Sequence, residues 1–158
     1  MTTPGSEPIT AEGLRALEAE LQRLETEERL AMSERIKAAR ELGDLKENAE
    51  YHIAKDDQAH LETKIKRLRE RLVAAKVVEA DEGDASFSFG RTAEVLDENT
   101  GKVHTWTIVG ATEADISAGR LAAESPVAQA LLGRREGETV QVQTPGGKRS
   151  YVIQKLVA

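Results

Sequence analysis

Two rows of leucine and isoleucine at helical spacing lie on either side of one glycine, and they restrict the fold of this chain more than any other feature. Four leucines of the first row recur three, four and three residues apart: Leu14, Leu17, Leu21 and Leu24. That spacing places them on one face of a helix, and Thr10 before them suits an N-cap. After Leu24 neither glycine nor proline occurs before Gly43, a residue type common just past a helix end. We therefore predict a helix from about Thr10 to Leu42.

The second row predicts a second helix that packs on the first. Its apolar residues alternate four and three positions apart: Leu61, Ile65, Leu68, Leu72 and Ala75. Two helices of roughly 30 residues joined by a very short turn must run antiparallel, as a hairpin about 45 Å long at the rise of an α-helix. Because each apolar seam would face water on an isolated helix, the helices should stabilise each other through these layers. A basic run from Lys64 to Arg71 lies on the second helix, and we interpret it as a solvated face.

The remainder of the chain has the character of a small α+β domain. The acidic, glycine-containing segment 79–84 breaks the helical pattern, so we predict a coiled-coil hairpin domain over residues 1–80 and an α+β domain over residues 81–158. Four runs rich in Val, Thr and Ile are predicted strands: Phe87–Leu96, Val103–Val109, Thr139–Thr144 and Ser150–Leu156. Turn residues at 99–101 and 145–147 suit antiparallel hairpins. Ser125 and Pro126 suit the N-cap and first position of a short helix that ends at Gly133.

Composition and charge argue against several classes of protein. A net charge of -6 is unsuited to broad contact with duplex nucleic acid, which depends on clustered Lys and Arg. The chain has no cysteine, and its three histidines lack neighbours at metal-ligand spacing, so a zinc site is not expected. The first eight residues lack the apolar core of a signal peptide, and no later stretch approaches a membrane span. A cytoplasmic protein without membrane contact is therefore predicted.

Acidic residues crowd the turn between the two predicted helices. The simplest explanation is structural, because Asp44 followed three residues later by Glu47 fits a capping box at the start of the second helix. Acids at that position also suit the helix dipole. The spacing alone therefore favours a purely structural role for both carboxylates.

The turn and its flanks also resemble a known family. Residues 43–51, which read Gly-Asp-Leu-Lys-Glu-Asn-Ala-Glu-Tyr, are similar to the hairpin tip of the bacterial Gre family of transcript-cleavage and elongation factors. Three later segments resemble recurrent segments of the family's second domain in the same order: Ser125–Ala128, Leu132–Gly133 and Thr144–Gly147. The resemblance covers nearly the whole chain. It implies a coiled-coil hairpin and a C-terminal domain of FKBP-like fold, which agrees with the architecture predicted from periodicity and turns.

The resemblance implies that the protein acts on RNA polymerase and is not itself an enzyme. In this family the hairpin enters the secondary channel of the polymerase, where the tip acids help to hold a second Mg²⁺ and a water beside the polymerase's own aspartates. That role falls to Asp44 and Glu47, which would share the ion only in the complex, because Mg²⁺ is usually held by one or two carboxylates together with substrate phosphate. The implied substrate is the 3′ end of a backtracked transcript, and the function is rescue of arrested elongation. We expect no cofactor to stay bound to the free protein, and we expect a monomer.

Other residues match positions that have roles in the family. Arg40 and Lys55 match basic positions that face RNA phosphates, although solvated helix residues with partners one turn away would look the same. Ser125 and Pro126 match the part of the family's second domain that docks on the polymerase. The same two residues can cap the short helix and also contact the polymerase. Tyr51 is expected to pack on the partner helix rather than to contact RNA.

Three other functions are compatible with parts of the pattern. A paralogue with the same rod could enter the channel and inhibit without cleavage, but the acidic tip favours cleavage. The FKBP-like fold suggests a prolyl isomerase, yet 3% aromatic residues leave little for an apolar aromatic pocket, and Trp106 on an alternating strand is predicted to be core. A coiled-coil interaction module, in which the tip acids only cap, is the third. The acidic pI of about 5.2 favours the less basic type of the family, which gives short cleavage products.

Overall fold

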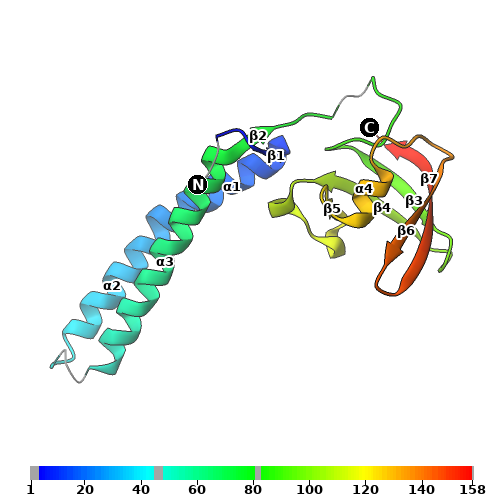
Figure 1. The fold of residues 1–158 in the computed structure, drawn as a ribbon. Coiled ribbons are helices and arrows are strands. Elements are labelled where there is room, and N and C mark those ends of the chain that lie inside the picture. The colour runs from blue at the N-terminus through cyan, green and yellow to red at the C-terminus, as the bar shows by residue number, and fades with distance from the viewer. Residues whose placement is uncertain (1–3, 45–47, 81–82, 158) are drawn as a thin grey trace. The chain divides into compact units, whose positions relative to one another are not determined.

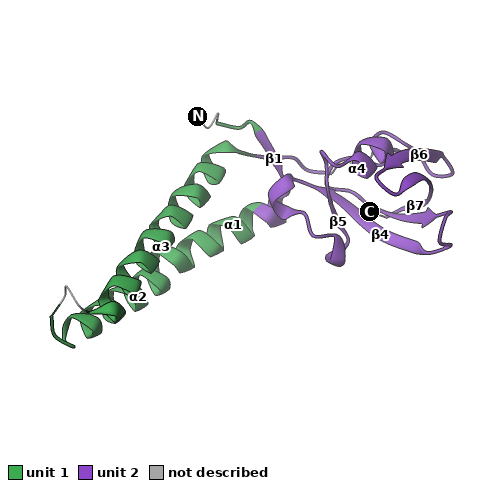
Figure 2. Ribbon diagram, turned by 60° about the horizontal axis from the view of Figure 1, so that its bottom comes forward, with its two compact units in different colours: residues 1–6, 14–75 green, residues 7–13, 76–158 purple. Residues whose placement is uncertain are grey.

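A computed structural model describes residues 4–44, 48–80 and 83–157 of the chain. The chain divides into two compact units (Figure 2). The first comprises Met1–Ser6 and Leu14–Ala75, and the second comprises Glu7–Gly13 and Lys76–Ala158. In the part of the chain that is described, no helix is long and apolar enough to cross a membrane.

The first unit is a helical hairpin. Three segments follow one another without a break in the first arm: α1 (Ala11–Arg23), the π-helical turn η1 (Leu24–Glu28) and α2 (Arg29–Arg40). The second arm is α3 (Ala49–Ala74), which lies beside α2 (Figure 1). The two predicted helices are therefore confirmed, with the first arm ending at Arg40 rather than Leu42.

Apolar side chains of the two arms meet along the predicted seam. Their buried cluster consists of Leu21, Leu24, Ile65 and Leu68, with Leu17, Leu61 and Leu72 packed against it. Closer to the turn the buried residues are Ile36 and Ala39 on α2 and Ala54 on α3, so two of the three are alanines. The leucine and isoleucine layers thus hold the root of the hairpin, while mainly alanines separate the arms near its tip.

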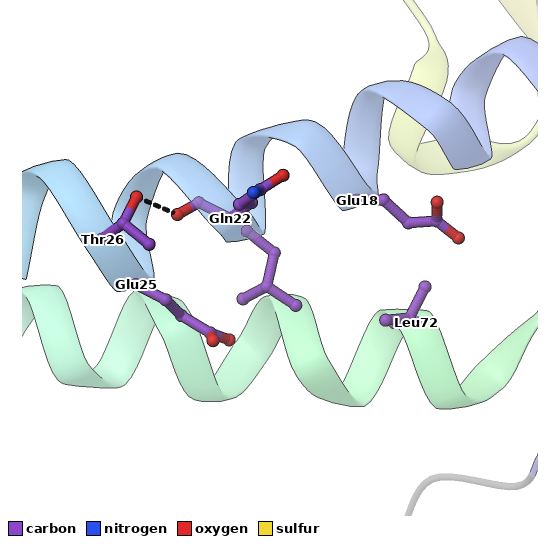
Figure 3. A pocket seen from close by; sticks show the side chains of 6 residues that line it. Glu18, Gln22, Glu25, Thr26 and Leu72 are labelled. Atoms are coloured by element: carbon purple, nitrogen blue, oxygen red, sulfur yellow. Dashed lines mark hydrogen bonds between the residues drawn. The ribbon is translucent and has the colours of Figure 1, made fainter.

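The π-helical turn is a feature that the sequence did not predict. A π-turn bonds residues five apart instead of four. Two positions that face α3, Leu24 and Arg29, are five residues apart, and Arg29 bonds Glu62 of α3 at 2.8 Å. The wider turn therefore allows both Leu24 and Arg29 to face α3, although they are five residues apart. Beside it lies an open groove of about 190 Å³ between the arms (Figure 3), lined by Glu18, Leu21, Gln22, Glu25, Thr26 and Leu72.

Ion pairs link the two arms along their exposed edges. Besides Arg29–Glu62 they are Arg35–Asp57 at 2.7 Å, Lys64–Glu20 at 3.6 Å and Arg69–Glu25 at 3.0 Å. Exposed pairs of this kind contribute at most about 1 kcal/mol each. Lys64 and Arg69 belong to the predicted solvated face, which is confirmed as exposed and also pairs with the opposite arm.

These pairs predict that the hairpin is destabilised by acid. The hydrogen bond from Arg23 lowers the pKa of Glu20 below its usual 4.5, and the hydrogen bond from Arg29 does the same to the pKa of Glu62. A carboxyl whose pKa is lowered in the folded state stabilises that state above the unfolded pKa and loses this contribution as pH falls through the folded pKa. The thermal midpoint of unfolding, followed by the helical signal in circular dichroism, should fall in the original protein between about pH 5 and about pH 3. We expect this fall to be a few degrees larger than the fall in Glu62→Gln, which lacks the titrating carboxyl. An equal fall in both proteins would contradict this assignment.

The second unit contains a curled five-stranded sheet in the order β5-β4-β3-β7-β6. Its strands are β3 (Thr92–Asp97), β4 (Val103–Val109), β5 (Arg120–Ala122), β6 (Thr139–Thr144) and β7 (Gly147–Val157). The pairs β3–β4, β3–β7 and β6–β7 are antiparallel, and the turns at 99–101 and 145–147 close two of them as predicted. The edge strand β5 pairs parallel with β4, so the sheet is mixed. The predicted α+β fold class is confirmed.

A single cluster of buried apolar side chains forms the core of this unit. Its fully buried side chains include Phe87, Ile108, Leu131 and Ile153, and α4 (Pro126–Leu131) contributes the third of these. Trp106 is buried as predicted and meets the ring of Tyr151 edge to face at 5.5 Å between centroids. The predicted strand Phe87–Leu96 is shorter than expected, because a turn in which Arg91 N–H bonds the Ser88 carbonyl at 3.1 Å precedes Thr92.

Short segments join the ends of the hairpin arms. β1 (Glu7–Ile9) and β2 (Ala75–Val77) form a two-stranded sheet, and Val78 N–H bonds the Ile9 carbonyl at 2.9 Å. Thr10 caps α1 as predicted, because its hydroxyl accepts the Gly13 N–H at 3.0 Å. The carboxylate of Glu113 reaches the same turn and accepts the Thr10 N–H at 3.1 Å, a contact with no counterpart in the sequence pattern.

Candidate functional site

The acidic turn lies where the two arms of the hairpin meet. The last turn of α2 closes with Glu41 N–H bonding the Lys37 carbonyl at 3.3 Å and Leu42 N–H bonding the Ala39 carbonyl at 3.2 Å. Gly43 follows with a φ of 126°, a value that a residue with a side chain rarely adopts. It is therefore the glycine, as predicted from its position, that turns the chain away from the helix.

Asp44 is exposed in the segment that follows and does not cap the second arm. α3 begins at Ala49, and its N-cap is Asn48, whose side-chain oxygen accepts the Tyr51 N–H at 3.1 Å. The prediction that Asp44 is the N-cap of the second arm is therefore wrong, because α3 takes Asn48 as its N-cap four residues later. Glu47 itself lies outside the described residues.

Asn48 also bonds the opposite arm. Its side-chain nitrogen donates to the Ala39 carbonyl in the last turn of α2, while its oxygen caps α3. Sequence reasoning did not single out this residue. The signal was present, because asparagine is among the most favoured N-cap residues, but Asp44 offered an equally good cap four residues earlier.

A basic and an aromatic side chain meet beside this cap. The Arg40 guanidinium lies over the Tyr51 ring at 5.8 Å from its centroid, a cation–π contact between the end of α2 and the start of α3. Tyr51 is half-buried, so its predicted packing on the partner arm is confirmed. Such a contact is worth about 0.5–1 kcal/mol at an exposed site.

Lys55 lies one turn further along α3. Its ammonium group donates to the Gln58 side chain at 2.9 Å and is exposed. Arg40 is exposed as well. Both cations can therefore meet an external anion, and the contacts just described orient them without burying them.

The chemistry available at the tip is that of exposed hard oxygen donors. Among residues 4–44, 48–80 and 83–157, no three His, Cys, Asp or Glu side chains are grouped so that they could hold a metal ion. A single exposed carboxylate such as Asp44 fits the way Mg²⁺ is commonly bound, since this ion keeps several waters and takes one or two carboxylates beside phosphate oxygens. Asp44 suits one ligand of an ion whose other ligands come from a partner.

Ser125 and Pro126 begin α4 in the second unit. The Ser125 hydroxyl accepts the Ala128 N–H at 3.3 Å, and Pro126 occupies the first turn of the helix, so the predicted cap is confirmed. Pro126 is exposed and Ser125 is half-buried. Their predicted contact with a polymerase stays a prediction.

Comparisons with known proteins match most of the chain, in both units. A family model described as "Transcription elongation factor, N-terminal" matches residues 7–77, and one described as "Transcription elongation factor, GreA/GreB, C-term" matches residues 82–156. Transcription elongation factor GreA of Cereibacter sphaeroides is 47% identical over 146 residues, which cover 92% of this chain and 94% of that protein. The factor of the same name from Ruegeria pomeroyi is 46% identical over 146 residues with the same two shares. Among solved structures, the GreA factor homolog 1 protein of Thermus thermophilus is 24% identical with a TM-score of 0.43, over 97% of this chain and 99% of that chain.

Proposed function

The chain belongs to the GreA/GreB family of transcription elongation factors, and from this we propose that it stimulates RNA polymerase to cut its own backtracked transcript. In this proposal the hairpin enters the secondary channel of the polymerase and presents its tip to the catalytic centre. The protein contributes ligands and contacts, and the polymerase performs the cleavage. The result is a new RNA 3′ end from which an arrested complex resumes elongation.

The observation that carries the proposal is the position of Asp44. Its carboxylate is exposed at the turn between two helical arms, and the helix that follows is capped by another residue. Asp44 and Glu47 would be the residues that help to hold a Mg²⁺ ion shared with the polymerase. When bound, such an ion supplies charge that stabilises the attacking and leaving oxygens of a phosphodiester beside a second metal about 4 Å away.

Arg40 and Lys55 are proposed to contact the phosphates of the extruded RNA. The Tyr51 ring under the Arg40 guanidinium limits its directions, so less side-chain entropy is lost when it binds. Ser125 and Pro126 are proposed to lie in the surface with which the second unit docks on the polymerase. The exposed ring of Pro126 offers a rigid apolar contact there.

The two alternative activities make different demands. Prolyl isomerisation needs aromatic side chains that line a pocket. In the second unit Phe87, Trp106 and Tyr151 are buried in the core, and Phe89 packs against it. This arrangement does not favour an isomerase. An inhibitor that enters the channel without supporting cleavage would need only the hairpin. A cleavage assay is therefore required to distinguish such an inhibitor from the proposed cleavage factor.

A defined backtracked elongation complex with end-labelled RNA tests the proposed function. We expect addition of the protein with Mg²⁺ to release short 3′ fragments faster than polymerase alone at the same Mg²⁺ concentration. Resumed elongation after addition of nucleotides should follow. Slowed elongation without RNA shortening would instead identify an inhibitor of the channel.

A further inference from the structure

We propose that Asn48 is a positioning residue that ties the two arms of the hairpin together and so fixes the segment that carries Asp44. This inference rests on the proposed function for its catalytic consequence. The tie itself is a property of the free protein. It assigns to Asn48 a role across the hairpin in addition to its role as a helix cap.

The first line of support is that one side chain serves both arms. The Asn48 oxygen accepts the Tyr51 N–H of α3, and its nitrogen donates to the Ala39 carbonyl of α2. Helix ends leave backbone groups without partners, and here one amide satisfies a donor at the start of one helix and an acceptor at the end of the other. The Ala39 carbonyl also accepts the Leu42 N–H at 3.2 Å, which uses both of its lone pairs.

The second line of support is a neighbouring contact between the same two turns. Arg40 follows Ala39 on α2, and its guanidinium lies over the ring of Tyr51, the residue whose N–H Asn48 caps. Two different interactions therefore join the last turn of α2 to the first turn of α3. Asp44 lies in the chain between these two tied turns, and holding both ends of a chain segment reduces the conformations open to the residues within it.

The chemistry of this tie requires an amide. Aspartate could accept the Tyr51 N–H, but it has no donor for the Ala39 carbonyl and would place negative charge at the negative end of the α2 dipole. Serine could cap α3 without adding charge, but its hydroxyl is too short to bond both arms. Both substitutions therefore keep the cap and remove the bond across the hairpin, and aspartate adds a negative charge as well.

The test compares Asn48→Ser and Asn48→Asp in the backtracked-complex assay, with the protein titrated to saturation. We expect both variants to lower the maximal cleavage rate at least about tenfold, because misplacing a group at a reaction centre by about 1 Å can cost more than that. The half-saturating concentration should stay within about twofold of the original, as binding does not use this bond. Circular dichroism should show unchanged helix content.

Asn99→Asp is the matched control. Asn99 also accepts a backbone N–H through its side-chain oxygen, from Ser150 at 3.0 Å, and lies in an exposed turn of the second unit. The substitution makes the same change of charge without touching the hairpin. We expect it to cleave at the original rate.

A measurement without polymerase separates this inference from the proposed function. Backbone order parameters from NMR should fall at Asp44 in Asn48→Ser, towards the flexible range below about 0.6, while those of α4 stay unchanged. If the unsubstituted protein fails to stimulate cleavage but this fall is observed, the proposed function is wrong and the tie stands. Unchanged order at Asp44, or a maximal cleavage rate in both variants equal to the original, would overturn the inference.

Discussion

Replacing Asp44 by Asn and Glu47 by Gln together is expected to lower stimulated RNA cleavage at least about a hundredfold, because a metal ligand that neutralises charge in the transition state supplies several kcal/mol. The amides keep the size of the side chains and remove the charge that Mg²⁺ needs. Since Asn48 caps α3, loss of the Asp44 charge should leave the thermal midpoint of the hairpin nearly unchanged. Fragment release from a backtracked complex measures the effect.

The matched control for this double substitution changes two other exposed carboxylates of α3, Asp56→Asn and Glu70→Gln. It alters net charge equally and should leave cleavage within about twofold of the original, since exposed charges away from the site act weakly. Polymerase binding should persist in both doubles. If the tip double still stimulates cleavage, the assignment of the two acids is wrong, and the hairpin serves as an interaction module.

A proline at Ala54 is expected to abolish stimulation by breaking the second arm. Ala54 is fully buried against α2, near the start of α3. Proline there removes the N–H that bonds the carbonyl four residues earlier and collides with that carbonyl, at a cost of about 3 kcal/mol or more. Denaturant unfolding followed by circular dichroism should show the loss, and the cleavage assay should show no fragments above those of polymerase alone.

Ala49→Pro is the control for the same amino acid in the same helix. Ala49 is the first residue of α3, where proline costs little, and Asn48 before it has an extended rather than a helical backbone, with φ -83° and ψ 93°. Trp106 is the one tryptophan of the chain and reports on the second unit, which should stay folded in both variants. Cleavage by Ala54→Pro at the original rate would show that a continuous second arm is unnecessary.

The helices and most of the sheet follow from patterns that repeat in the sequence. Leucines at three and four residue spacing predicted both arms, and valine and threonine runs bounded by Gly and Asn turns predicted four of the five strands of the large sheet. The strands that were missed, β1, β2 and β5, have three residues each, too few for a period to appear. The π-turn was missed because a helical template assumes a constant number of residues per turn.

The tip was predicted in part. Its place between the arms is confirmed, and so is the glycine that follows the first arm, but the cap was assigned to Asp44 instead of Asn48. Both residue types are good caps. What decides between them is the Ala39 carbonyl of the other arm, a contact across the hairpin that no local spacing can express. The roles of Asp44, Glu47, Arg40 and Lys55 in an RNA polymerase complex stay predictions.

The change from leucine layers at the root to alanines at the tip has a consequence for the thickness of the rod. Helix axes approach to about 8 Å over small side chains and stand about 10 Å apart over large ones. With Ala39 and Ala54 buried between the arms, we expect the axes to lie closer at these two layers than at the layers of Leu21, Leu24, Ile65 and Leu68. Under the proposed function, close approach of the arms at these alanines would leave the acid-bearing end of the hairpin narrow enough to enter a confined channel.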